Sequence, residues 1–177
     1  MKTFDAINKR YSFRGSYQNT NIPREDLKKI LEAGLAAPSG CNTQTTSLIA
    51  LDDPELIGSI SALVKKNGFK GGNPPAGICI LTQPVPAYKD VCFNVQDYSA
   101  AIENMLLAIT ALGYASCWIE GQITESVETQ EQIAKLLGIP ANYIVVGFLP
   151  VGVPENEGKR PIYKAFEERA WFNGFGK

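Results

Sequence analysis

The sequence predicts an α+β fold in which a layered sheet carries helices on both faces. Three observations predict it. Apolar helical stripes alternate irregularly with about four strand-like segments, which is the pattern of a layered sheet. Residues 76–81 are apolar at every position except glycine, as in a strand that is covered on both faces. The 177 residues, 45% of them hydrophobic, suit a single domain over 1–177.

The first half of the chain contains three expected helices. A short helix opens the chain, with Thr3 as its expected cap. A second helix starts near Pro23, which suits a first turn, and stops before Pro38. A third begins with Asp53 as the cap and Pro54 in the first turn.

The remaining elements follow from apolar runs and glycine stops. The longest helix covers about 95–112 and is apolar over more than half of its circumference, so it belongs in a core or a subunit interface. Gly113 ends this helix, and Gly138 ends another over 128–137. Strands are expected at 47–51, 76–81, 115–119 and 143–149.

Charge and composition exclude several classes of protein. The net charge of −1 argues against nucleic acid as the main partner, because binding phosphates requires a cationic excess. Histidine is absent, which removes imidazole bases and histidine metal ligands, and no metal site is expected. No apolar stretch has the length of a membrane span, and no signal-peptide pattern is present. The four cysteines lack C-x-x-C spacing, so we expect a cytoplasmic protein with reduced, mostly buried thiols.

Two cationic segments are candidates for an anion site. Arg10, Ser12 and Arg14 alternate along a segment that leaves a helix, so in an extended conformation all three would point to one side. Guanidinium groups offer paired donors that match a phosphate. Lys159 and Arg160 form a second cationic point late in the chain. For both segments the alternative interpretation is a solvated basic surface.

Two turn segments could contact a planar ligand. Hydrogen-bonding side chains gather in the loop of Pro38, Ser39, Asn42 and Gln44, which suits a heterocycle with carbonyl and imide edges. Glu120-Gly121 follows an apolar run, and a glycine there lets the backbone approach a ligand closely. The alternative in both cases is ordinary turn chemistry.

The order of these motifs resembles the nitroreductase family of flavoenzymes. The resemblance rests on Arg10-Tyr11-Ser12-Phe13-Arg14, on Ala37-Pro38-Ser39-x-x-Asn42-x-Gln44, and on the helix from Asp97 to Leu112-Gly113, and it covers the chain from Phe4 to about Arg160. It implies a dimeric fold with a central, mainly antiparallel sheet. It also implies two FMN sites at the subunit interface, with residues from both chains, and NADH or NADPH as the transient electron donor.

The resemblance assigns cofactor-binding roles residue by residue. Positions that match the phosphate site are Arg10, Ser12, Arg160 and its neighbour Lys159. Arg14 matches a cation near the flavin pyrimidine, and Asn67 and Lys70 have the spacing of residues that touch that edge in some members. Pro38, Ser39, Asn42 and Gln44 match a loop that often reaches the flavin from the other subunit, and Glu120 and Gly121 match backbone near flavin N5.

No side chain is expected to be catalytic, because the flavin carries the chemistry. The implied reaction is ping-pong electron transfer from NAD(P)H to an electron-poor acceptor such as a nitroaromatic or a quinone. A non-catalytic flavin-binding or storage protein is one alternative. Another is a same-fold enzyme for dehalogenation or flavin fragmentation.

The chain departs from the family at two places, and its end carries a further expectation. Thr45 and Thr46 stand where the family often has proline and an aromatic residue, and the insert over the substrate pocket is reduced. Substrate preference is therefore not inherited. The aromatic tail at about 161–177 is expected to pack on the partner subunit.

Overall fold

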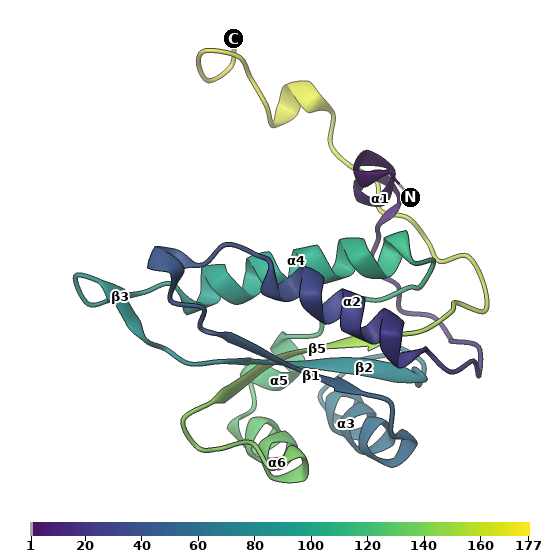
Figure 1. Cartoon of the computed structure of the whole chain (residues 1–177). Helices are drawn as coiled ribbons and strands as arrows, with labels where there is room; N and C mark the ends of the chain where they lie inside the picture. Colours follow the sequence, from purple (N-terminus) through teal and green to yellow (C-terminus); the bar gives the residue numbers. More distant parts are fainter. Residues whose placement is uncertain (1) are drawn as a thin grey trace.

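A three-stranded antiparallel sheet forms the centre of the molecule. In the computed structural model, which describes residues 2–177, the strand order is β1-β2-β5 (Figure 1). The strands are β1 (Thr46–Leu51), β2 (Ala76–Thr82) and β5 (Ile144–Val151). Every residue of the middle strand β2 is buried, as the uninterrupted apolar run predicts.

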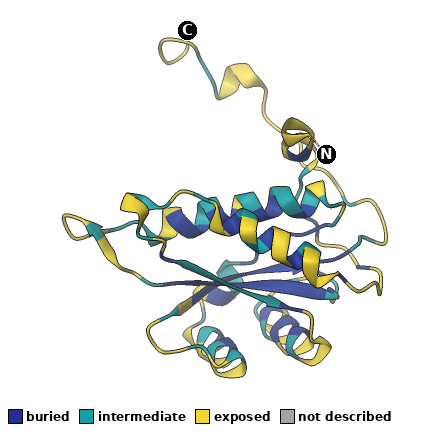
Figure 2. Ribbon diagram, in the orientation of Figure 1, coloured by how far each residue is buried: buried dark blue, intermediate teal, exposed yellow. Residues whose placement is uncertain are grey.

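Helices cover both faces of this sheet. One face carries α2 (Arg24–Leu35) and α4 (Asn94–Ala111), and α1 (Thr3–Lys9) packs on α4. The other face carries α3 (Pro54–Lys66), α6 (Val127–Leu137) and the short α5 (Gly121–Thr124) (Figure 1). Two hydrophobic clusters result, one on each side of the sheet, and dark blue residues line both inner surfaces in Figure 2. The predicted fold class is confirmed.

Local signals in the sequence set most helix ends. The Asp53 carboxylate accepts hydrogen bonds from the backbone N–H groups of Glu55 (2.8 Å) and Leu56 (3.2 Å), as expected for a cap. Gly113 and Gly138 have φ angles of +89° and +64°, which favour glycine after a helix. The expectation for Thr3 is wrong: α1 begins at Thr3 itself, and its N-cap is Lys2, whose side chain makes no capping hydrogen bond.

The predicted strand at 115–119 is also wrong. This segment makes only isolated bridges within the described chain, pairing Ala115 with Gly152, Ser116 with Ser12, and Ile119 with Phe148. It therefore runs beside β5 without forming a continuous ladder. Apolar composition alone cannot distinguish such a segment from a regular strand, because both are buried.

A hairpin and a tail project from the two-sided core. The hairpin consists of β3 (Pro86–Tyr88) and β4 (Val91–Cys92), next to the 3-10 turn η1 (Gly40–Asn42). The tail contains a second 3-10 turn, η2 (Phe166–Glu168), and extends away from the sheet (Figure 1). Phe172 at 74% and Phe175 at 87% remain exposed there, whereas Trp171 is half-buried (Figure 2).

All four cysteines are free thiols. Cys79 and Cys117 are buried, Cys92 is half-buried and Cys41 is exposed, so the expected burial holds for two of the four. No helix among residues 2–177 combines the length and hydrophobicity that crossing a membrane would require.

Candidate functional site

An open groove of about 540 Å³ brings the two predicted cationic segments together. Arg10, Ser12 and Arg14 form one side, and Lys159 and Arg160 form the other. Arg10 and Arg160 both line the groove although they are 150 residues apart in the sequence. The first residues of the tail, Pro161, Ile162 and Tyr163, complete the lining of the groove.

The first side of the groove is an extended segment with alternating burial. Phe13 is buried, and its backbone N–H donates to the carbonyl of Ser116 at 2.8 Å, while Ser12 and Arg14 are exposed. Since side chains alternate along an extended chain, fixing Phe13 in the core turns its two neighbours outward. The predicted one-sided presentation of Arg10, Ser12 and Arg14 is thus realised in the groove.

Tyr11 joins this segment to the late cationic pair. Its hydroxyl oxygen accepts a hydrogen bond from the Gly158 backbone N–H at 3.1 Å. The Arg160 guanidinium lies 5.5 Å from the centroid of the Tyr11 ring, within the range of a cation–π contact. A Cβ at Gly158 would lie 2.6 Å from a ring carbon of Tyr11, so glycine allows this close approach.

The groove carries a strong excess of positive charge. Arg10 forms an ion pair with Glu103 of α4, with Nε 3.4 Å from Oε1. Within residues 2–177, Arg14, Lys159 and Arg160 make no such pair. Four cations line this groove and none of its lining residues is acidic, which favours binding of an anion, and a phosphate dianion matches the guanidinium donors.

A glycine-rich loop lies against the same extended segment. The Gly72 N–H donates to the Gly15 carbonyl at 3.1 Å, and a Cβ at Gly72 would lie 2.9 Å from the Ser16 Cα. In this loop Lys70 is exposed. The Asn67 side-chain nitrogen instead donates to the Gln122 carbonyl at 2.7 Å and to the Thr129 hydroxyl at 2.8 Å. Both amide hydrogens of Asn67 are therefore used inside the protein, and only its oxygen is left for a ligand.

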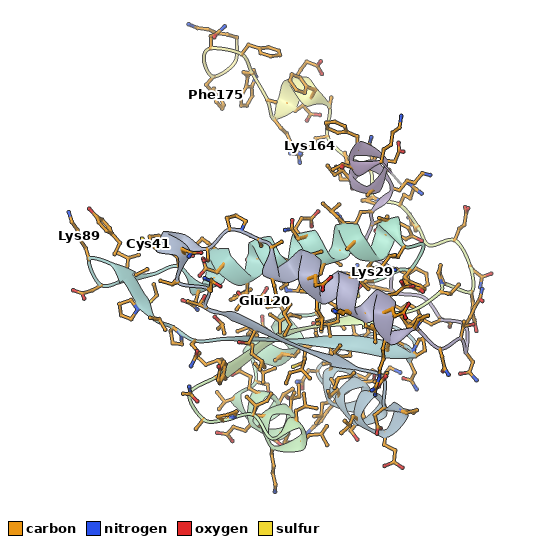
Figure 3. The ribbon with its side chains drawn as sticks, viewed as in Figure 1. Lys29, Cys41, Lys89, Glu120, Lys164 and Phe175 are labelled. Carbon is orange, nitrogen blue, oxygen red and sulfur yellow. The ribbon has the colours of Figure 1, made fainter. Side chains whose placement is uncertain are left out.

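Glu120 and Gly121 lie where the 115–119 segment enters α5. The Tyr98 hydroxyl donates to Glu120 Oε1 at 3.0 Å, so the carboxylate is held toward α4 between the layers (Figure 3). Burial, with a smaller contribution from this carboxylate, raises the pKa of Tyr98 to about 12. Gly121 is the first residue of α5, so its N–H has no acceptor within the helix.

The loop of Pro38, Ser39, Asn42 and Gln44 adopts a strained, internally bonded conformation. Ser39 Oγ accepts a hydrogen bond from the Gln44 N–H at 3.0 Å, and the Gln44 amide donates to Asn42 Oδ1 at 3.4 Å. Cys41, Asn42 and Gln44 all have positive φ angles of 50–56°, which are unfavourable for residues other than glycine. Pro38, Ser39 and Gln44 line a cavity of about 180 Å³.

Asp97 holds this loop in place, a role that sequence reasoning missed. The buried carboxylate accepts hydrogen bonds from the Gly40 N–H and the Thr45 hydroxyl, both at 2.7 Å. Asp97 forms part of the motif that begins the long helix, and a charged residue in an apolar stripe is the available signal. Its two partners are more than 50 residues away, so spacing could not identify them.

The cationic groove and the loop of Pro38, Ser39, Asn42 and Gln44 meet opposite ends of α4. The groove residue Arg10 also lines a small cavity with Leu106 and Thr110, near the end of α4. The loop meets Asp97 and Ala101, near its start. In Figure 3 the labelled Cys41 marks the loop end of the molecule, and Lys164 marks the tail that leaves the groove on the other side.

Comparison with known proteins gives the family. The sequence profile of the nitroreductase family matches residues 7–79 and 63–153. A curated protein of Archaeoglobus fulgidus, provisionally named NADH dehydrogenase/NAD(P)H nitroreductase, is 34% identical over 84% of this chain and 83% of its own length. The solved FMN-dependent nitroreductase of Clostridium difficile R20291 is 29% identical, with a TM-score of 0.80 over 97% of this chain and 99% of that one.

A second solved structure was determined with its cofactor. The nitroreductase with bound FMN from Bacteroides fragilis is 29% identical and has a TM-score of 0.75, over 93% of this chain and 96% of that one. The cationic groove, the loop at the start of α4 and the antiparallel sheet thus occur in a chain that belongs to the nitroreductase family.

Proposed function

We propose that this protein is an FMN-dependent oxidoreductase that takes electrons from NADH or NADPH and reduces an electron-poor organic acceptor. The observation that carries the proposal is the convergence of Arg10, Ser12, Arg14, Lys159 and Arg160 in one groove. The FMN-dependent and FMN-bound nitroreductases with similar folds support it.

The groove residues would hold the FMN phosphate. Arg10 and Arg160 offer guanidinium donors from opposite sides, and the Ser12 hydroxyl offers a further hydrogen bond. Tyr11 fixes the Arg160 side in position through its ring and its bond to Gly158. The donor set therefore fits a phosphate dianion.

The neighbouring segments would bind the ring. Arg14 and the exposed Lys70 would supply cations near the flavin pyrimidine, where positive charge would stabilise the reduced form. Backbone at Glu120-Gly121 would face N5, since the Gly121 N–H is free of helix bonding. The chemistry that bound FMN would supply is two-electron transfer between a nicotinamide donor and a nitro or quinone acceptor.

We further propose that a second copy of the chain completes each site. The loop of Ser39, Asn42 and Gln44 lines a different cavity from the cationic groove, so one chain does not present both groups to one ligand. The exposed aromatic tail, with Phe166, Phe172 and Phe175 uncovered, supports an arm that packs on the partner. Four free thiols are typical of a reducing compartment and support a cytoplasmic location.

An absorbance spectrum of the purified protein tests the cofactor and the reaction together. After addition of FMN and desalting, we expect flavin absorbance bands that correspond to about one FMN per chain. Anaerobic NADH or NADPH should bleach these bands, and a nitroaromatic or a quinone should restore them. Bound flavin that neither nicotinamide reduces would instead favour a storage protein. Protein that emerges from desalting without flavin would refute the proposal.

A further inference from the structure

The β3–β4 hairpin is a candidate for the element that selects the electron acceptor. It projects beyond the start of α4, at the same end of the molecule as η1 (Figure 1). Lys89 and Asp90 form its two-residue turn, with φ angles of +46° and +63°. Such turns favour asparagine, aspartate and glycine, so Lys89 is the unusual occupant. The molecule thus places a lysine and an aspartate at the tip of a projecting element.

The base of the hairpin is fixed to the loop that carries Ser39, Asn42 and Gln44. A Cβ at Gly40 would lie 2.5 Å from the Phe93 side chain, so the loop backbone lies directly against the residue after β4. Between β2 and the hairpin, the Gln83 N–H donates to the Thr45 carbonyl at 3.1 Å. Asp97 holds Gly40 and Thr45 in turn. A ligand that meets the loop therefore lies beside the hairpin.

The hairpin presents an aromatic and cationic surface that its own chain does not use. Tyr88 is 57% exposed and Val91, its partner across the hairpin, is 48% exposed. The Lys89 ammonium lies 5.2 Å from the centroid of the Tyr88 ring, and Figure 3 shows Lys89 at the outer end, on the same side as Cys41. A flat ring and an adjacent positive charge match an aromatic molecule that bears an anionic group.

We propose that Tyr88 and Lys89 form an acceptor subsite that favours flat aromatic acceptors with a carboxylate. This inference rests on the proposed function, in which the loop reaches the flavin of the partner copy. Tyr88 supplies stacking area for any aromatic acceptor, while Lys89 attracts only the charged one. Asp90 is the one other charged residue of the turn, and it opposes this selection.

Steady-state reduction of 4-nitrobenzoate and of neutral nitrobenzene by the FMN-loaded full chain tests the subsite. Lys89→Gln should raise the KM for 4-nitrobenzoate about fivefold and leave kcat and the KM for nitrobenzene unchanged, as expected for one exposed charge contact. Asp90→Asn should lower the KM for 4-nitrobenzoate. Tyr88→Ala should raise both KM values. Lys135→Gln, at an exposed lysine of α6 on the far face of the sheet, is the matched control and should change neither.

Each result decides the question. Equal effects of Lys89→Gln on both acceptors, or an equal effect of Lys135→Gln, would overturn the subsite while nitrobenzene turnover still upheld the proposed function. Wild-type protein that binds FMN but reduces neither acceptor would overturn both. A reduction of nitrobenzene with no preference for 4-nitrobenzoate in the wild type would overturn the subsite alone.

Discussion

At the residue scale, Tyr11 connects the two sides of the cationic groove. Its hydroxyl binds the Gly158 N–H, and its ring lies under the Arg160 guanidinium. The neighbouring Phe13 is buried and packs edge-on against Tyr17 at a centroid distance of 5.1 Å. Tyr11 and Phe13 thus stabilise the segment, while the residues that alternate with them line the groove.

Arg10 gives the first prediction at this scale. Arg10→Ala should weaken FMN binding by about 2 kcal/mol, or roughly 30-fold in Kd, the usual value for a hydrogen bond to a charged group. Fluorescence titration of the apoprotein with FMN measures this change. Glu103→Gln is the control, because it removes the ion-pair partner of Arg10 and should not weaken FMN. An unchanged Kd for Arg10→Ala would show that the phosphate binds elsewhere.

The four thiols give a second prediction. Burial raises the pKa of Cys79 to about 12 and that of Cys117 to about 11, so both remain protonated and covered at neutral pH. A maleimide at pH 7.5 should label exposed Cys41 first and half-buried Cys92 more slowly, and should leave the other two unlabelled until urea is added. Mass spectrometry of timed samples reads the order. Early labelling of Cys79 would contradict the burial of β2.

At the element scale, the start of α4 serves as an anchor for a loop. Asp97 sits in the first turn of the helix, where a carboxylate is also favoured by the helix dipole. It binds the Gly40 N–H and the Thr45 hydroxyl, and thereby joins α4 to the segment that enters β1. The unfavourable positive φ angles of Cys41, Asn42 and Gln44 can persist because this anchor and the Phe93 contact surround them.

Removing the anchor should therefore be costly. Asp97→Ala leaves a backbone N–H and a hydroxyl without their acceptor, and we expect a loss of about 3 kcal/mol in the free energy of unfolding. Urea denaturation measures it. Asp53→Ala, which removes the exposed cap of α3, is the comparison and should cost about 1 kcal/mol. Similar losses in both variants would mean that Asp97 contributes no more than an ordinary helix cap.

At the scale of the whole molecule, the tail is the feature that a single chain leaves unexplained. Trp171 and Phe175 contact each other with ring centroids 4.2 Å apart, and Phe166 and Phe172 are 6.0 Å apart, but the tail extends away from the sheet (Figure 1). Exposed aromatic side chains forfeit the free energy that burial would supply. A partner copy that covers them would recover it.

Deleting residues 171–177 tests this interpretation. Light scattering should give about twice 19.3 kDa for the full chain. The truncated chain should dissociate into monomers at a higher protein concentration than the full chain does, or unfold at a lower temperature. Circular dichroism serves as the control that the domain still folds. If the mass, the dissociation behaviour and the melting temperature all stay the same, the tail does not hold the assembly together.

Local chemistry in the sequence predicted five of the six α-helices in the described chain, all but the short α5, together with the three sheet strands and the cations of the groove. These signals act within a few residues, so their effects can be predicted without tertiary contacts. Examples are the helix cap Asp53, the helix-ending Gly138 and the all-apolar strand β2. For Arg10, Ser12 and Arg14 the sequence predicted a shared side on the condition that their segment is extended.

The tertiary structure decided what joins these pieces. Three features depend on partners far away in the chain. The 115–119 segment pairs only in isolated bridges, and both Asn67 amide hydrogens are donated to Gln122 and Thr129. Asp97 likewise accepts a hydrogen bond from the loop backbone. Spacing fixes only neighbours along one element, whereas a hydrogen bond between distant residues exists only after the sheet and its helices have packed. The tail shows the same division, because its aromatic sequence predicts burial whereas Phe166, Phe172 and Phe175 are exposed in the folded chain.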